Sequence, residues 1–139
     1  MIGSEDEARH FVAERCSAHA LASLDRFADA LLIEAERQNL ISRSTMPLLW
    51  HRHFADSAQL LDHVPRETDG PWLDLGTGAG FPGLVTSIMR PDVPHVLVES
   101  RKRRIEWLAE AIETIGLSNC TLHGSRLEQV ESFEADIIT

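Results

Sequence analysis

Hydrophobic positions near the start of the chain repeat with the period of an α-helix. Five apolar residues are separated by steps of three or four positions: Leu21, Leu24, Ala28, Leu31 and Ala35. Charged residues fill many of the positions between them, so residues 21–35 are predicted to form a helix with one apolar face. A shorter helix is predicted before it, over Glu7–Ala18.

A second amphipathic helix is predicted to begin near Thr45, a residue type that caps helix N-termini, with Pro47 in its first turn. Its apolar face contains residues four, four and three positions apart: Trp50, Phe54, Ala58 and Leu61. Pro65 ends this pattern, and the polar run Arg66–Pro71 follows. Residues 1–65 are therefore expected to form a helical extension.

After Pro71 the pattern changes to short apolar runs. Four of these runs predict strands: Trp72–Leu75, His95–Glu99, Thr121–His123 and Ala135–Thr139. Helices are predicted between them: Gly83–Arg90, Arg101–Ile115 and a short helix from Ser125 through Val130. This alternation indicates an α/β domain over residues 71–139, with a parallel Rossmann-like sheet and helices on both faces. The fourth strand is expected beside the first, across the point where the strand order reverses.

The composition is that of an ordinary folded protein, with 43% hydrophobic and 25% charged residues. A net charge of −9 repels nucleic acid at long range, so an RNA or DNA partner must be met by a local basic patch. Two cysteines exclude a disulfide framework and a cysteine-rich zinc module. The acidic N-terminus and the short apolar runs predict a cytoplasmic protein with no membrane span.

The strongest chemical signal is the run Asp74-Leu75-Gly76-Thr77-Gly78-Ala79-Gly80, where the first predicted strand ends. Glycines at such a turn let the backbone bend tightly and approach a ligand closely. Glu99 ends the second predicted strand, where an acid can accept hydrogen bonds from both hydroxyls of a ribose. The two segments together predict a nucleotide-like ligand.

Three interpretations of this loop remain open. Gly78–Gly83 spells the G-x-G-x-x-G pattern of dinucleotide-binding proteins, but that pattern should begin at Gly76, the first glycine after the strand. The pattern D-x-G-x-G-x-G resembles the first motif of class I S-adenosylmethionine (SAM) methyltransferases, in which Asp74 suits a cationic amino-acid tail and Glu99 the ribose. The third interpretation is a glycine-rich turn without a ligand. The position of Asp74 favours SAM.

Several motifs occur in order along the chain: Asn39-Leu40-Ile41-Ser42, Arg52-His53-Phe54-Ala55-Asp56-Ser57, Leu73–Gly83, Arg90-Pro91 and Glu99-Ser100. Together they resemble the bacterial RsmG/GidB family, which methylates N7 of guanine 527 in 16S ribosomal RNA. The R-H-x-x-D-S element combined with G-T-G-x-G-x-P-G is more specific than a SAM motif alone. The resemblance extends over roughly residues 20–139. It covers only part of a typical family member, so we expect this chain to be part of a longer protein.

The resemblance implies a SAM site and an RNA-binding surface. The expected cofactor-binding residues are Asp74, Gly76, Gly78, Gly80, Phe81, Glu99, Leu127 and Glu128. The residues expected to meet the RNA are Arg52, His53, Arg103 and Arg104, with ordering of the SAM loop as a further role for Arg52 or His53. Glu99 stands where the family usually has Asp, and Arg103 where it often has Lys.

No catalytic residue and no metal ligand is assigned from the sequence. Guanine N7 carries a free lone pair, so alignment and charge stabilisation are expected instead of proton removal. His51 and His53 point apart on a helix, and no third metal ligand is evident. An ion pair between Arg52 and Asp56 is an alternative, purely structural use of that arginine. The basic run Arg101–Arg104 either contacts phosphate or is a solvated first turn of a helix.

The favoured function is therefore a SAM-dependent rRNA methyltransferase, a monomer whose partner is 16S rRNA or the small ribosomal subunit. The acidic net charge favours an alternative, a SAM-dependent methyltransferase of a small molecule. An inactive SAM-binding fragment and a nicotinamide-dependent oxidoreductase also remain open.

Overall fold

The computed structural model describes residues 2–125 and 135–139. The strands of these residues are β1 Trp72–Leu75, β2 His95–Glu99, β3 Cys120–Gly124 and β4 Ile137–Ile138. They form a sheet in the order β3-β2-β1-β4, and every neighbouring pair is parallel. β4 therefore lies beside β1, across the switch point from β2, and the predicted Rossmann-like arrangement is confirmed.

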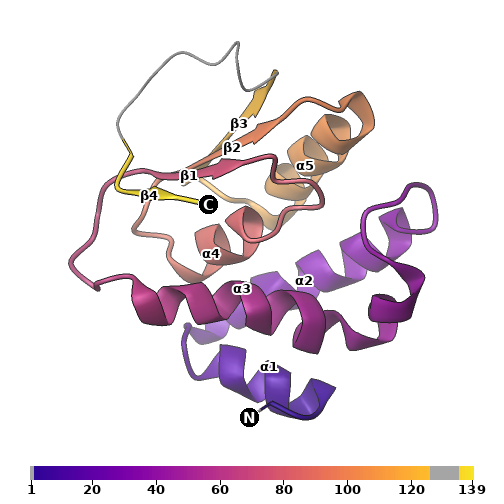
Figure 1. Ribbon diagram of the computed structural model, residues 1–139, viewed down its shortest axis with the longest axis horizontal. Coiled ribbons are helices and arrows are strands. Elements are labelled where there is room, and N and C mark those ends of the chain that lie inside the picture. The colour runs from indigo at the N-terminus through magenta and orange to yellow at the C-terminus, as the bar shows by residue number, and fades with distance from the viewer. Residues whose placement is uncertain (1, 126–134) are drawn as a thin grey trace.

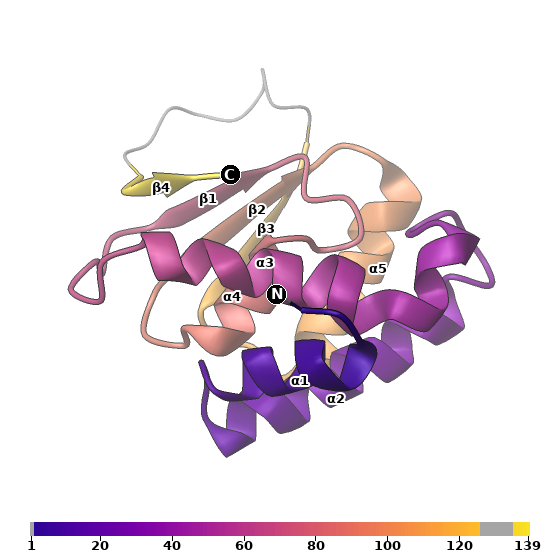
Figure 2. The ribbon, with the colours of Figure 1, turned by 60° about the horizontal axis from the view of Figure 1, so that its bottom comes forward.

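Two helices connect the first three strands: α4 Gly83–Met89 and α5 Lys102–Ile115. Gly116 ends α5 in a left-handed conformation with a φ of +80°, as its position after the last apolar residue predicts. All helices of the described residues lie on the same face of the sheet (Figures 1 and 2), so the prediction of helices on both faces is not confirmed within these residues. Apart from Ser125, the short helix predicted from Ser125 through Val130 falls outside the described residues, as do the cofactor contacts predicted at Leu127 and Glu128.

The N-terminal helices are α1 Glu5–Ala13 and α2 Ala18–Glu34. Ser4 caps α1 by accepting a hydrogen bond from the Glu7 N–H, and Ser17 caps α2 in the same way. The first helix ends earlier than predicted because Ser17 begins the next one. In α2 the predicted apolar face packs inward, and no helix of the described ranges is long and apolar enough to cross a membrane.

The segment that follows is a composite of short helical turns, and the prediction of a regular helix beginning at Thr45 is wrong in detail. Its parts are η1 Arg43–Leu48, η2 Trp50–Phe54, α3 Ala55–Gln59 and η3 Leu60–His63, of which η1 and η3 are 3₁₀ turns and η2 is a π turn. Pro47 has no N–H to continue an α-helix. The N–H groups of Trp50 and His51 donate instead to the carboxylate of Glu5 in α1, at 3.0 and 2.7 Å.

Phe27 of α2 occupies the centre of the core. Its ring stacks on Phe54 at 5.5 Å and on Trp107 of α5 at 6.1 Å between ring centroids. All three side chains are buried, and they belong to the same hydrophobic cluster as Leu84 and Leu97 of the α/β part. The helical extension therefore packs directly on the helices that flank the glycine-rich turn.

Candidate functional site

A glycine-rich loop joins the C-terminal end of β1 to α4. Gly76 and Gly78 have φ angles of +67° and +59°, in the left-handed region that residues with a Cβ rarely adopt. The N–H groups of Gly76 and Thr77 both donate to the carbonyl of Val98, at 2.9 and 3.1 Å. These two hydrogen bonds hold the start of the loop against the neighbouring strand β2.

The loop has an open half and a packed half. A Cβ added to Gly76 would meet no atom within 4 Å. In contrast, a Cβ on Gly80 would overlap Leu84, and a Cβ on Gly83 would overlap Leu97. The later glycines are therefore required by packing, whereas Gly76 leaves space for a ligand to approach the backbone.

Asp74 lies at the base of the loop and is 2% exposed. Its carboxylate accepts hydrogen bonds from Thr77 Oγ1 at 2.6 Å, Gly83 N at 2.9 Å and Thr139 Oγ1 at 3.1 Å. Burial raises the pKa of Asp74, and these three hydrogen bonds oppose that effect. Asp74 thus joins the loop, the start of α4 and the residue after β4, while its contact with a cationic ligand tail stays a prediction.

Glu99 ends β2 and is also buried. One carboxylate oxygen accepts from the N–H of Gly78 at 2.9 Å, and the other accepts from the N–H groups of Ser100 and Arg101 at 3.1 and 2.9 Å. A cavity of about 250 Å³ beside it is lined by Leu75, Gly76, Val98, Glu99, Ser100 and Ser125. This is the C-terminal edge of the parallel strands, where open α/β sheets bind their ligands.

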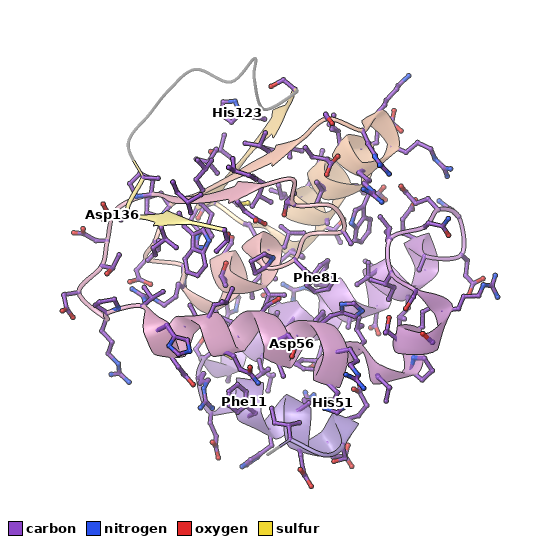
Figure 3. All side chains as sticks on the ribbon, viewed as in Figure 1. Phe11, His51, Asp56, Phe81, His123 and Asp136 are labelled. Atoms are coloured by element: carbon purple, nitrogen blue, oxygen red, sulfur yellow. The ribbon has the colours of Figure 1, made fainter. Side chains whose placement is uncertain are left out.

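Phe81 connects the loop to the helical extension (Figure 3). Its ring stacks on His53 at 5.0 Å and lies 5.8 and 5.7 Å from the rings of Phe27 and Phe54. The His53 Nε2 atom is 2.9 Å from Thr45 Oγ1, and burial lowers the pKa of His53. The His53 ring therefore packs against the loop, while the ordering of the SAM loop by His53 stays a prediction. Its contact with RNA stays a prediction.

Arg52 and Asp56 do not form the ion pair considered as a structural alternative. The salt bridges of the described residues do not include this pair, and both residues are exposed. A reason is the π turn η2, which changes the register that brings residues four apart together in an α-helix. Both side chains instead border a pocket of about 230 Å³ that Phe81 and Pro82 also line.

The side chains of Arg103 and Arg104 reach the backbone of the segment that follows α2. Arg103 Nη2 donates to the carbonyl of Arg37 at 2.8 Å, and Arg104 Nη2 donates to the carbonyl of Asn39 at 3.4 Å. Gln38 Nε2 donates in return to the carbonyl of Arg103 at 3.2 Å. The basic run thus holds a neighbouring segment in place, and contact of Arg103 and Arg104 with RNA stays a prediction.

Three residues of this site were not predicted from the sequence: Thr77, Trp107 and Thr139. The two threonines donate to Asp74, and Trp107 Nε1 donates to the carbonyl of Ala79 at 3.0 Å. Thr77 carries a local signal, a hydroxyl three residues after a buried acid in a glycine-rich turn. Trp107 and Thr139 carry no such signal, because only the folded chain brings them to the loop.

Solved structures of other proteins share this fold. A protein-L-isoaspartate O-methyltransferase matches 96% of this chain and 46% of its own length, with a TM-score of 0.61 and 15% identity. The structure of MtNAS in complex with S-adenosylmethionine matches 97% of this chain and 56% of its own length, with a TM-score of 0.57 and 16% identity. The parallel sheet and its glycine-rich turn place the chain in the class of Rossmann-like α/β folds.

Sequence comparison identifies the family within this class. The GidB family, described as rRNA small subunit methyltransferase G, matches residues 20–139. The ribosomal RNA small subunit methyltransferase G of Erythrobacter litoralis is 53% identical over all of this chain and 67% of its own length. Its counterpart in Novosphingobium aromaticivorans is 55% identical over 80% of this chain and 50% of its own length. The chain belongs to the rRNA small subunit methyltransferase G family, which confirms the predicted resemblance, and it spans half to two thirds of these relatives.

Proposed function

We propose that this chain is the SAM-binding part of an enzyme that methylates N7 of guanine 527 in 16S ribosomal RNA. Bound SAM supplies a methyl group that its sulfonium sulfur has already activated. The observation that carries the proposal is the pair of buried carboxylates, Asp74 and Glu99, at the ends of neighbouring parallel strands beside the open side of Gly76. Membership of the family supports the choice of rRNA as substrate.

Asp74 favours SAM over a nicotinamide dinucleotide. In dinucleotide-binding folds, the N–H groups at the start of the first helix bind the pyrophosphate. Here the N–H of Gly83, the first residue of α4, already donates to Asp74. A pyrophosphate at this position would meet a buried carboxylate, whereas the ammonium group of SAM would be attracted to it.

Glu99 and the adjoining cavity suit the ribose of SAM. The carboxylate is held in a fixed orientation by three backbone N–H groups. A carboxylate accepts hydrogen bonds only, and a ribose offers two neighbouring hydroxyl donors. Because Gly76 and Glu99 line the same cavity, the sugar would lie beside the open half of the loop.

The reaction requires alignment more than acid–base catalysis. Guanine N7 attacks through its lone pair and no proton leaves, so the chain has to orient the base and exclude water. The packing of Phe81 on His53 holds the end of the loop while this happens. We therefore assign no general base and expect a flat rate profile between about pH 7 and 8, above the ordinary pKa of histidine.

Calorimetric titration with SAM, S-adenosylhomocysteine and NAD tests the cofactor. We expect heat of binding with SAM and with its demethylated product, and none with NAD. Heat with NAD alone would overturn the proposal in favour of an oxidoreductase. Heat with none of the three would show that this chain does not hold the cofactor.

Asp74→Asn tests the role of the buried charge. The amide oxygen can still accept hydrogen bonds from Thr77 and Gly83, but the negative charge is lost. We expect SAM affinity to fall about tenfold or more, because a charge-assisted contact is worth at least about 1.5 kcal/mol. Asp69→Asn, in the exposed loop before β1, is the matched control and should bind SAM like the unmodified chain. Equal affinity in both variants would show that Asp74 only orders the loop.

Methyl transfer is tested with small ribosomal subunits and SAM, followed by mass spectrometry of the RNA. We expect 7-methylguanine at position 527. Methylation of a different atom or nucleotide would overturn the specificity, and transfer only to small molecules would support the alternative function. Binding of SAM without any transfer would limit this chain to cofactor binding.

A further inference from the structure

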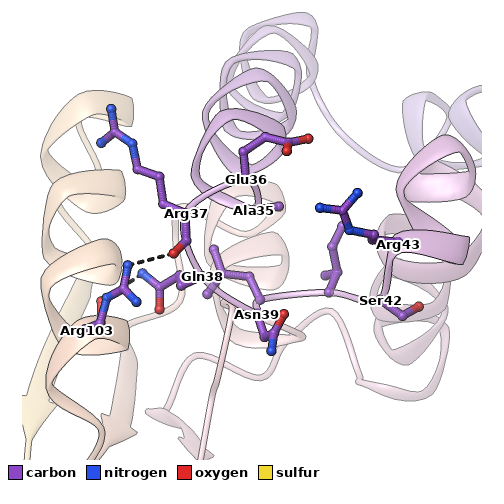
Figure 4. Close-up of a pocket in the computed structure, with 10 residues that line it drawn as sticks. Ala35, Glu36, Arg37, Gln38, Asn39, Ser42, Arg43 and Arg103 are labelled. Carbon is purple, nitrogen blue, oxygen red and sulfur yellow. Dashed lines mark hydrogen bonds between the residues drawn. The ribbon is translucent and has the colours of Figure 1, made fainter.

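We infer that a basic pocket between the end of α2 and the start of α5 binds backbone phosphates of the RNA substrate. The pocket has a volume of about 570 Å³ and is lined by residues 35–43 and Arg103 (Figure 4). The inference rests on the proposed function, because that function makes RNA the substrate. It adds a second contact surface, distinct from the cavity beside Glu99.

The charge of this pocket is opposite to that of the whole chain. Arg37, Arg43 and Arg103 line it, and Glu36 is the one carboxylate among the lining residues, all of which the structure describes. The whole chain carries 13 basic and 22 acidic residues. The run Arg101–Arg104 extends the positive charge along the first turn of α5. An acidic protein that binds RNA needs such a local basic patch.

The backbone of the pocket is held in place, whereas two of its arginines are free to turn toward a ligand. Hydrogen bonds between Arg103 and residues 37–38 fix the segment. The Arg37 guanidinium lies 3.8 Å from Glu34, and the Arg37 side chain is 71% exposed, so this ion pair is weak. Arg43 is exposed and forms no ion pair within the part of the chain that the structure describes.

The lining of the pocket suits phosphates more than bases. No aromatic residue lines it, so a base would find no ring to stack on. The three guanidinium groups, two from the segment of residues 35–43 and one from α5, are spread around the pocket (Figure 4). This arrangement fits successive phosphates of one strand better than a single small anion. Contacts of this kind position RNA without reading its sequence.

The pocket is also linked to the cofactor site through the start of α5. The N–H of Arg101 donates to Glu99 in the cofactor site, and Arg103, two residues further along, lines the basic pocket. RNA held at the pocket therefore lies at the same end of α5 as the cofactor cavity. This placement allows the pocket to anchor the strand that presents its base for methylation.

The test is the salt dependence of binding to a 16S rRNA transcript. The double variant Arg37→Gln/Arg43→Gln removes two phosphate contacts but leaves the backbone carbonyl of Arg37 that Arg103 uses. We expect binding about tenfold weaker at low salt. The slope of log affinity against log salt concentration should fall by roughly 1.4, since each contact to a single strand contributes about 0.7. Glu36→Gln should act in the opposite direction and tighten binding.

Arg66→Gln is the matched control. Arg66 is exposed and belongs to the loop before β1. That loop lies at the other end of the molecule from the segment between α2 and α3 (Figure 1). This variant should keep the salt dependence of the unmodified chain. If both variants weaken binding equally, or if the unmodified chain does not bind the transcript, the inference is overturned.

Calorimetry with SAM separates this inference from the proposed function. The double variant should bind SAM and unfold at the same temperature as the unmodified chain, because both arginines are exposed and distant from the glycine loop in sequence. Normal SAM binding with an unchanged salt slope would overturn the phosphate pocket alone. If the unmodified chain does not bind SAM, the proposed function is overturned instead.

Discussion

Asp74 and Glu99 in the proposed cofactor site are almost completely buried, whereas Arg37 and Arg43 in the basic pocket are exposed. The carboxylates are bonded to backbone N–H groups and threonine hydroxyls. Arg37 lies in the segment that follows α2, and Arg43 is the first residue of η1. The side chains of Arg103 and Arg104 in α5 donate hydrogen bonds to the carbonyls of Arg37 and Asn39 and so hold this segment. One site is thus part of the folded core, and the other is attached to its surface.

This difference separates the energetics of the two sites. A buried polar group that loses its partner costs about 1–3 kcal/mol, whereas an exposed ion pair contributes about 0–1 kcal/mol. Substitutions in the cofactor site should therefore change folding and binding together. Substitutions in the basic pocket should change binding alone. A small ligand held at fixed distance needs a rigid site, whereas a charged RNA strand tolerates mobile side chains.

Gly83→Ala is expected to give the largest loss of stability, about 3 kcal/mol. The new methyl group would overlap Leu97 and Asp74 in the packed half of the loop. Gly116→Ala is the matched control, because its methyl group would meet no atom within 4 Å and only its φ of +80° is unfavourable. That control should lose about 1–2 kcal/mol. Urea denaturation measures the free energy of unfolding of both variants. Equal losses would show that the packed half of the loop accommodates the added methyl group without a loss of stability.

The second largest expected effect is on the pH dependence of stability. It comes from His95, the first residue of β2, the strand that ends with Glu99. His95 is buried, stacks on Trp72, and is hydrogen-bonded to the Val93 carbonyl and Thr86 Oγ1 at 2.8 and 3.0 Å. Burial lowers the pKa of His95 from 6.5 to about 4. The folded chain therefore keeps this imidazole neutral while the unfolded chain takes up a proton below about pH 6.5. Stability falls as the pH falls through this window and levels off below about pH 4.

Between pH 7 and pH 5 this histidine should reduce the free energy of unfolding by about 2 kcal/mol. His95→Phe preserves an aromatic ring against Trp72, and the Val93 carbonyl still accepts from Asn119 Nδ2 at 2.9 Å. The variant should lose about 2 kcal/mol less than the unmodified chain over the same range. Urea denaturation at the two pH values measures this difference, and identical pH dependence in both chains would contradict the assignment to His95.

Local patterns predict the strands that carry Asp74 and Glu99 but not the basic pocket. Continuous apolar runs locate β1 and β2, and because parallel strands end at one edge of the sheet, Asp74 and Glu99 were expected near each other. The irregular turns between residues 43 and 63 could not be predicted, since Glu5 in α1 accepts the N–H groups of η2 from a distant part of the sequence. In the same way, residues 39–44 appear in the sequence only as an interruption of the helical period. The basic pocket forms because Arg103 and Arg104 of α5, more than sixty residues later in the chain, donate hydrogen bonds to the carbonyls of Arg37 and Asn39.

Arg103→Ala tests that attachment and is expected to have the smallest effect on stability. The exposed hydrogen bond from Arg103 to the Arg37 carbonyl should contribute about 0.5 kcal/mol. Hydrogen exchange at residues 37–41 should nevertheless become several-fold faster, because the segment loses a backbone tie. Lys102→Ala is the control, since it removes the same charge from the same helical turn and makes no side-chain hydrogen bond within residues 2–125 and 135–139.

A loss above about 2 kcal/mol for Arg103→Ala would contradict the contrast between the two sites, because the pocket would then be part of the cooperative core. Unchanged exchange at residues 37–41 would show that the arginine does not hold the segment. The expected result lies between these limits, with a stable fold and a loosened segment. Such a variant would retain SAM affinity while weakening RNA binding. The pocket loses the charge of Arg103, and Arg37 and Arg43 keep their charge but lose a hydrogen bond that positions their backbone.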